Sequence, residues 1–252
     1  MNRALHWFSV ILSLCTLLLV MDGAVAGRAE PHRAAATIVS ILILGLAIWL
    51  TKGGSRRLGW ITIAIVTLNA LAGAYSPLAH AWLAPTLVAV LVTVAMATSE
   101  SWARGPELVR DYGWPSLRSL AIVTPCLVLM QIALGAAFRH SAATLMPHVL
   151  GALLVAVVIL MQGIFVLQQF PTHRALRPAA ATLLGVGFAQ VFLGITALIM
   201  KTMSDDTALA VMIPVAAHIA GGALTLATTV VMSVLIRRNV QPRVREKAED
   251  AS

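Results

Sequence analysis

Charged residues are scarce in this chain, and this scarcity limits the class of protein to which it can belong. Only 11% of its 252 residues are charged, only 10 are Asp or Glu, and 59% are hydrophobic. Soluble globular domains are about a quarter charged and about half apolar. A soluble fold is therefore excluded, and the composition, with a mean hydropathy of +0.88, predicts an integral membrane protein.

Cysteine is almost absent, and so are the motifs of several common enzyme classes. Cys15 and Cys126 each lie inside an apolar run and form no CxxC or other zinc-type spacing. The chain also lacks a phosphate-binding loop, an HExxH zinc motif and a GxSxG nucleophile elbow. The familiar zinc, nucleotide and serine-hydrolase sites are thereby excluded.

What the chain has instead is eight long apolar runs. A membrane-spanning helix needs about 20 apolar residues. We therefore expect spans at residues 6–24, 32–52, 57–76, 80–98, 117–137, 144–169, 178–200 and 208–237. The predicted fold class is all-α integral membrane, with eight transmembrane helices as two tandem four-helix bundles. The polar segment 99–116 separates an N-terminal half, residues 1–100, from a C-terminal half, residues 117–237, and the charged tail 238–252 is expected to be a disordered cytoplasmic tail.

The net charge of +8 is explained by membrane orientation rather than by nucleic acid, because the basic residues lie between spans and at the C-terminus. Only four fall on one predicted side of the membrane, Arg28, Arg33, Arg139 and Lys201. The other fourteen fall on the opposite side: Arg3, Lys52, Arg56, Arg57, Arg104, Arg110, Arg118, Arg174, Arg177, Arg237, Arg238, Arg243, Arg245 and Lys247. Because the side richer in Lys and Arg faces the cytoplasm, both termini are predicted to be cytoplasmic.

Four histidines stand at the beginning of the even-numbered spans: His32, His80, His148 and His218. The predicted orientation places all four near the outer surface. A small residue follows each by four positions, one helical turn, and leaves room beside the imidazole for a flat ligand: Ala36, Ala84, Ala152 and Gly222. Gly151 and Gly221, one position earlier, are expected to add to this room. Ionisable side chains inside a membrane are costly and usually functional. We therefore predict two pairs of axial haem ligands, His32 with His80 and His148 with His218.

Each histidine alone is more readily explained as an interfacial or hydrogen-bonded residue, and only the fourfold repetition favours ligation. His6 and His173 lie on the inner side, so we expect ordinary structural roles for them. His140 follows Arg139 at a span end and is expected in a loop or beside a haem propionate. Arg139 is a candidate propionate partner for the same reason.

An internal repeat precedes the histidines. Gln131 to Gly135 matches Gln190 to Gly194, Asn69 to Gly73 is a weaker copy, and Gly23 alone remains of the first copy. Gln131 and Gln190 either hydrogen-bond across helices or face the cofactor. Glu30, two residues before His32, either transfers protons at a haem edge or is a solvated loop charge paired with Arg28 or Arg33.

These residues resemble the haem A synthase family of cytochrome oxidase assembly proteins over most of the chain. The resemblance is carried by the segments His80 to Ala84, Ala97 to Trp102, Gln131 to His140, Pro147-His148, Gln190 to Gly194, His218 to Gly222 and the pair His32-Arg33. The loop 22–31 is shorter than the corresponding family loop, and Asn69 stands where the family has glutamine.

The resemblance implies an oxidoreductase that converts the ring methyl of haem O to a formyl group, giving haem A. The haem b cofactor would lie on His148 and His218, with Gln131, Gln190 and Arg139 around it. The substrate haem O would lie on His32 and His80, with Glu30 as a catalytic residue. The expected location is the cell inner membrane, and the expected partners are membrane lipid, an electron donor and a haem O synthase. The sequence leaves open whether the chain forms a homo-oligomer.

Two other functions compete with this interpretation. The first is a non-catalytic haem-binding or electron-transfer protein on the same scaffold, which the shortened first loop favours. The second is a small-solute transporter built from parallel repeats. No clear helix break lies at the predicted midplane, and the histidines lie near the outer surface, so transport is disfavoured.

Overall fold

The computed structural model describes residues 3–25, 29–205 and 208–242. Within these ranges the chain forms helices joined by short loops, with one pair of two-residue strands. In chain order the elements are α1 (Arg3–Asp22), α2 (Ala29–Lys52), α3 (Arg56–Tyr75), α4 (Pro77–Ala97), α5 (Glu100–Ala103), β1 (Val109–Arg110), α6 (Leu117–Arg139), α7 (Leu145–Gln169), α8 (Leu176–Met203), α9 (Leu209–Asn239) and β2 (Val240–Gln241).

Eight of these helices, all except α5, are long and apolar enough to cross a membrane. Their bounds agree with the predicted spans to within a few residues, so that prediction is confirmed. The outer surface of the helices is apolar: Phe188 is 78% exposed, Ile213 65% and Leu153 63%. Exposed apolar surface of this extent is typical of lipid contact. The protein is a multi-pass membrane protein, and its free cysteines lie within spans, Cys15 half-buried and Cys126 exposed.

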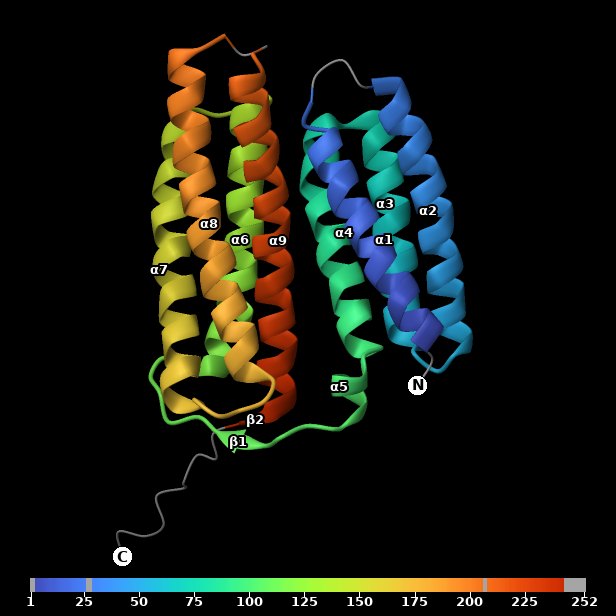
Figure 1. The fold of residues 1–252 in the computed structure, drawn as a ribbon, viewed down its shortest axis with the longest axis vertical. Coiled ribbons are helices and arrows are strands. Elements are labelled where there is room, and N and C mark those ends of the chain that lie inside the picture. Colours follow the sequence, from blue (N-terminus) through green and yellow to red (C-terminus); the bar gives the residue numbers. More distant parts are fainter. Residues whose placement is uncertain (1–2, 26–28, 206–207, 243–252) are drawn as a thin grey trace, which may run out of the picture.

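The neighbours of each helix form two closed rings. In one ring α1, α2, α3 and α4 each contact the next, and α4 returns to α1. In the other ring α6, α7, α8 and α9 do the same, and α9 returns to α6. Figure 1 shows the two groups side by side, with α1 beginning and α9 ending at the same end of the molecule.

The two rings meet mainly where α4 packs against α9, and α1–α9 and α4–α6 contacts extend this seam. Hydrogen bonds also join the two groups. Trp82 Nε1 in α4 donates to the Leu129 carbonyl in α6 at 3.1 Å, and Arg139 Nη2 donates to the Ala24 carbonyl at 3.0 Å. The two groups are therefore joined in their apolar interior and again near the end of α6.

Local sequence signals set where two of the helices begin. The hydroxyl of Ser76 accepts a hydrogen bond from the Ala79 amide, and Pro77 follows at the first helical position. This combination of a serine cap and a proline favours a helix start. It places His80 in the first turn of α4. Ser116 caps α6 in the same way through the Ser119 amide.

The segment between the two groups is more ordered than a plain polar loop. It contains α5, and its strand β1 pairs in parallel with β2, with Val109 opposite Val240. Asp111 then accepts a hydrogen bond from the Leu117 amide at 2.6 Å, at the start of α6. The predicted tail began at residue 238, whereas Arg238 and Asn239 end α9 and residues 240–241 form β2. The rest of that predicted tail, residues 243–252, lies outside the described residues.

Candidate functional site: two pairs of facing histidines

The four predicted histidines face each other in two pairs. The ring centroids of His32 and His80 lie 6.5 Å apart with an interplanar angle of 81°. Those of His148 and His218 lie 6.2 Å apart at 85°. In each case the partners come from helices at opposite corners of a ring, α2 with α4 and α7 with α9. The pairing predicted from the sequence is thus the pairing that the fold brings together.

The depth of the histidines in their helices is not uniform. His32, His80 and His148 are each the fourth residue of their helix, whereas His218 is the tenth residue of α9. The helix that carries His218 therefore extends about two further turns beyond the site. The span predicted at residues 208–237 agrees with this start.

A glycine from the preceding span lies against each imidazole. A Cβ added at Gly23, Gly73, Gly135 or Gly194 would lie 3.0, 3.3, 2.9 or 2.8 Å from the nearest ring atom of His32, His80, His148 or His218, respectively. A side chain at any of these positions would require the histidine ring or its helix to move. The repeat that the sequence indicated therefore has a physical cause, because each copy needs a glycine where the next helix presents its histidine.

The ring nitrogen Nδ1 of the histidines faces the protein. His80 Nδ1 lies 3.2 Å from the backbone carbonyl of Asn69. His148 Nδ1 lies 2.9 Å from the side-chain nitrogen Nε2 of Gln131, and His218 Nδ1 has no hydrogen-bond partner among the described residues. Over the described ranges no hydrogen bond forms at Nε2 of these three rings or of His32. Three of the four rings therefore have a polar partner at Nδ1, and Nε2 of all four is left available for another ligand.

Gln131 links α6 to α7 beside the second pair. Its side-chain amide donates to the His148 carbonyl at 2.7 Å and lies 2.9 Å from His148 Nδ1. The space above Gly151 is filled by the Gln131 carboxamide, and Gln190 fills the equivalent space above Gly221. These glycines therefore make room for the glutamines, whereas the sequence suggested that they make room for a flat ligand.

Buried polar atoms without a hydrogen-bond partner gather around the two histidine pairs. Among the described residues, four of the six buried side-chain atoms without a hydrogen-bond partner belong to this site: Asn69 Oδ1, Gln131 Oε1, Gln190 Oε1 and His218 Nδ1. The other two belong to Gln162, lower in α7, which is fully buried. Burying an unsatisfied polar atom costs about 1–3 kcal/mol, so such atoms are usually retained for function.

The first pair has a carboxylate that sequence reasoning missed. Asp22 Oδ2 lies 3.2 Å from Nδ1 of His32, and both side chains are largely shielded. The signal was present in the sequence, since Asp22 directly precedes Gly23, where the other repeat copies have Ala72, Leu134 and Leu193. His32 consequently differs from the other three histidines, whose Nδ1 faces backbone or amide groups.

The remaining predicted site residues lie farther from the rings. Glu30 is 88% exposed at its side chain and lies 3.5 Å from Arg33, so it forms a surface ion pair. Arg139 ends α6, exposed, and its guanidinium binds the Ala24 carbonyl. Neither residue contacts an imidazole of the two pairs through a hydrogen bond or ion pair in the described ranges.

The histidines assigned structural roles have them. His6 Nδ1 lies 2.9 Å from the Ala95 carbonyl. His173 is buried, and its Nδ1 accepts hydrogen bonds from the Ala175 and Leu176 amides, each at 3.1 Å, at the start of α8. Its Nε2 donates to the Glu107 carbonyl at 3.0 Å. His173 therefore caps the start of α8.

Comparison with known proteins does not identify this site. No protein-family model matches the chain, and no curated protein matches its sequence. The functional conclusion therefore depends on the geometry of the residues themselves.

Proposed function

We propose that this protein is a haem A synthase-like membrane oxidoreductase that converts the ring methyl of haem O to a formyl group and so supplies haem A for cytochrome oxidase assembly. In this proposal haem b is held by His148 and His218, and the substrate haem O binds between His32 and His80. The two rings of helices act as tandem four-helix bundles in the cell inner membrane, with both termini cytoplasmic.

One observation carries the proposal: the spacing of the facing imidazoles. A metal–imidazole nitrogen bond is about 2.0 Å long, and the centre of a five-membered ring lies about 1.1 Å from its atoms. Two imidazoles that bind one metal ion from opposite sides through Nε2 would therefore have centroids about 6.2 Å apart. The observed separations are 6.2 Å and 6.5 Å. Two ligands without a third from Asp, Glu or Cys suit a metal whose remaining positions are filled by a macrocycle.

The groups behind the histidines fit the same role. A metal-binding histidine usually donates its other ring N–H to a carbonyl or a carboxylate, which fixes the tautomer and the ring orientation. The Asn69 carbonyl would do this for His80, and the Asp22 carboxylate for His32. A bound haem would supply the iron chemistry that oxidises the ring methyl, while the chain orients the ring and tunes its ligands.

The difference between the pairs supports different tasks. Hydrogen bonding to a carboxylate makes an imidazole a more basic ligand than hydrogen bonding to a neutral carbonyl. His32 has such a carboxylate in Asp22, whereas His148 has only Gln131. We therefore assign substrate oxidation to the first pair and electron transfer from a donor protein to the second. The oxidation would be two successive hydroxylations of the methyl group. Each would consume one dioxygen, two donor electrons and two protons and release one water, and the resulting gem-diol would lose water to give the formyl group. Arg139, at the end of α6, is the propionate partner in this proposal.

A second candidate is a non-catalytic haem-binding or electron-transfer protein on the same scaffold. The position of Glu30 favours it, because this side chain is exposed and paired with Arg33 instead of facing His32. In the catalytic proposal, Glu30 acts only after it leaves that ion pair. The two candidates agree on the haem at His148 and His218 and differ at the first pair.

Haem extraction from cells separates the candidates. The chain is co-expressed with a haem O synthase in cells that lack their own haem A pathway, and extracted haems are resolved by chromatography. Haem A accumulation supports the enzyme, whereas bound haem b without haem A, in the presence of a working electron donor, supports the second candidate. Purified protein without haem absorbance would overturn both.

Histidine variants test the assignment of the two pairs. His148→Ala or His218→Ala should remove the resident haem from the purified protein, because each deletes one of the two residues that would hold it. His173→Ala is a matched control, since His173 caps α8 away from either pair. A normal haem spectrum in the His148 and His218 variants would show that the cofactor is elsewhere.

A further inference from the structure

A cleft of about 380 Å³ opens at the end of the molecule opposite the histidine pairs. Its walls come from the end of α4, from α5, from the start of α8 and from the end of α9. It therefore lies on the seam where the two rings of helices meet. Three arginines line it, Arg104, Arg174 and Arg238.

The protein itself holds two of the guanidinium groups in place. Arg238 lies over the Trp102 ring, with its Cζ 3.5 Å from the ring centroid, and its Nη2 donates to the Trp102 carbonyl at 2.7 Å. Arg174 Nη2 donates to the Gly105 carbonyl at 3.0 Å. A guanidinium has five N–H donors, so both groups keep donors free while their positions are fixed.

The positive charge of this cleft is only partly neutralised. Glu107 lies 3.6 Å from Arg174 and is the acidic partner of the three arginines in the described part of the chain. Arg104 is exposed, and no hydrogen bond or ion pair of its side chain is found in those ranges. Three arginines and one glutamate leave an excess of two positive charges.

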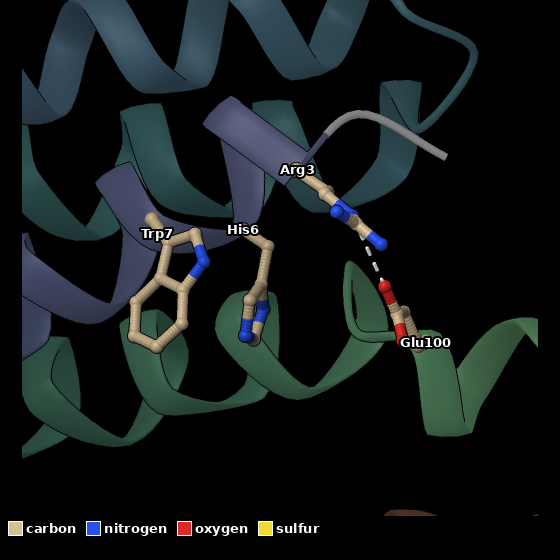
Figure 2. A pocket seen from close by; sticks show the side chains of 4 residues that line it. All are labelled: Arg3, His6, Trp7 and Glu100. Atoms are coloured by element: carbon tan, nitrogen blue, oxygen red, sulfur yellow. Dashed lines mark hydrogen bonds and ion pairs between the residues drawn. The ribbon is translucent and has the colours of Figure 1, made fainter.

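A second cleft at the same end of the molecule provides a contrast. It is lined by Arg3, His6, Trp7 and Glu100 (Figure 2). There the single arginine is matched by a carboxylate, since Arg3 Nε lies 3.3 Å from Glu100 Oε1. The excess of positive charge is therefore particular to the cleft on the seam.

Above the arginines the wall of the cleft is apolar. Val231 and Leu235 precede Arg238 by seven and three positions, so all three lie on one face of α9. The seven steps from Val231 to Arg238 rise about 10 Å along the helix. Met96 and Pro178 continue this surface on α4 and α8. The cleft thus joins a cationic end to an apolar wall that leads into the membrane-spanning region.

We propose that this cleft binds one anionic phospholipid. Its phosphate lies among Arg104, Arg174 and Arg238, and its acyl chains run along Val231 and Leu235. Basic pockets between transmembrane helices at the membrane surface are suited to such headgroups. A free phosphate would satisfy the arginines but would leave the apolar wall without a partner. Because both rings of helices line the cleft, the lipid joins the two halves, and this role is independent of the haem proposal.

Native mass spectrometry of the full chain in detergent tests the proposal. The protein is titrated with phosphatidylglycerol and with phosphatidylcholine of identical acyl chains. We expect one phosphatidylglycerol to bind at least about tenfold more tightly than phosphatidylcholine, with affinity falling as salt rises. Equal affinity for the two lipids would overturn the proposal.

Single-charge variants locate the site. Arg104→Gln should weaken phosphatidylglycerol binding about fivefold, the value of one basic residue near an anionic surface. It leaves the protein's own contacts intact, unlike Arg238→Gln, which serves as the second variant. The matched control is Arg237→Gln, an equal loss of charge beside Arg238 but outside the lining. Equal effects of Arg104→Gln and Arg237→Gln would refute this location.

Competition with inorganic phosphate tests whether the cleft binds a lipid or a free anion. We expect millimolar phosphate to displace phosphatidylglycerol no better than an equal increase in ionic strength from chloride. Specific displacement by phosphate at lower concentration would identify a site for a free anion and overturn the assignment to a lipid.

Discussion

A methyl group added at Gly135 tests the histidine geometry most directly. The Cβ of Gly135→Ala would lie 2.9 Å from Cε1 and 3.2 Å from Nδ1 of His148. Optimal carbon contacts are about 3.5–4.0 Å, so the ring or its helix must move by about 0.6–1 Å. Binding sites tolerate displacements of only about 0.5 Å. The substitution should therefore disturb the ligand before it disturbs the fold.

The magnitude follows from two opposing effects. Replacing a helical glycine by alanine stabilises a helix by about 0.5–1 kcal/mol, whereas crowding a packed contact costs about 1–3 kcal/mol. The net change in the free energy of unfolding is therefore small and unfavourable, at about 0–2.5 kcal/mol. Disturbing the groups that hold a metal ligand typically costs about 10- to 100-fold in metal affinity. We expect a folded protein that retains much less haem.

Gly185→Ala is the matched control, because a Cβ at Gly185 in α8 would meet nothing within 4 Å. This variant should keep its haem and melt at the same or a slightly higher temperature. Haem per protein is measured by pyridine haemochrome absorbance, and folding by thermal melting in detergent. Equal haem content in the two variants would refute the assigned contact between Gly135 and His148.

Three further predictions concern the groups around the rings. Asp22→Asn should lower haem A formation about tenfold or more while the resident haem b stays bound, because His32 is the one histidine of the two pairs that loses a carboxylate. Chromatography of the extracted haems measures both haem A and haem b. Gln131→Leu should weaken haem retention about 10- to 100-fold by releasing His148, and an unchanged Soret band would contradict it. Arg139→Gln should lower the melting temperature by about 2–4 °C through loss of its bond to Ala24, compared with Arg57→Gln as an exposed control.

Most of the architecture could be predicted because apolar run length is a direct physical requirement of the membrane. Eight runs of about 20 residues correspond to eight spans, and the helices end within a few residues of the predicted bounds. The repeat also predicted which histidines would pair. Spacing within the chain cannot show packing across helices, however. For that reason the sequence assigned Gly151 and Gly221 to a flat ligand, whereas they accommodate Gln131 and Gln190.

Other features were missed because they depend on contacts between distant segments. The approach of Asp22 to His32 requires the turn after α1 to bring the carboxylate back to α2. The strand pair β1–β2 joins residues 109–110 to residues 240–241, and two-residue strands carry no sequence period that could be detected. The basic residues near the ends of the spans were explained by orientation alone. Which of them share one cleft depends on how α4, α8 and α9 meet.

The strand pair β1–β2 affects how the order of the helices α6–α9 along the chain could be changed. Val109 and Val240 lie opposite each other, Arg118 Nη1 binds the Val240 carbonyl at 2.8 Å, and the Glu107 amide donates to Asn239 at 2.8 Å. The chain therefore enters and leaves the group α6–α9 at a single point. Domains whose two ends lie together tolerate circular permutation. A short linker could join residue 241 to residue 109, and new ends could open in the loop between α7 and α8 without stretching any helix.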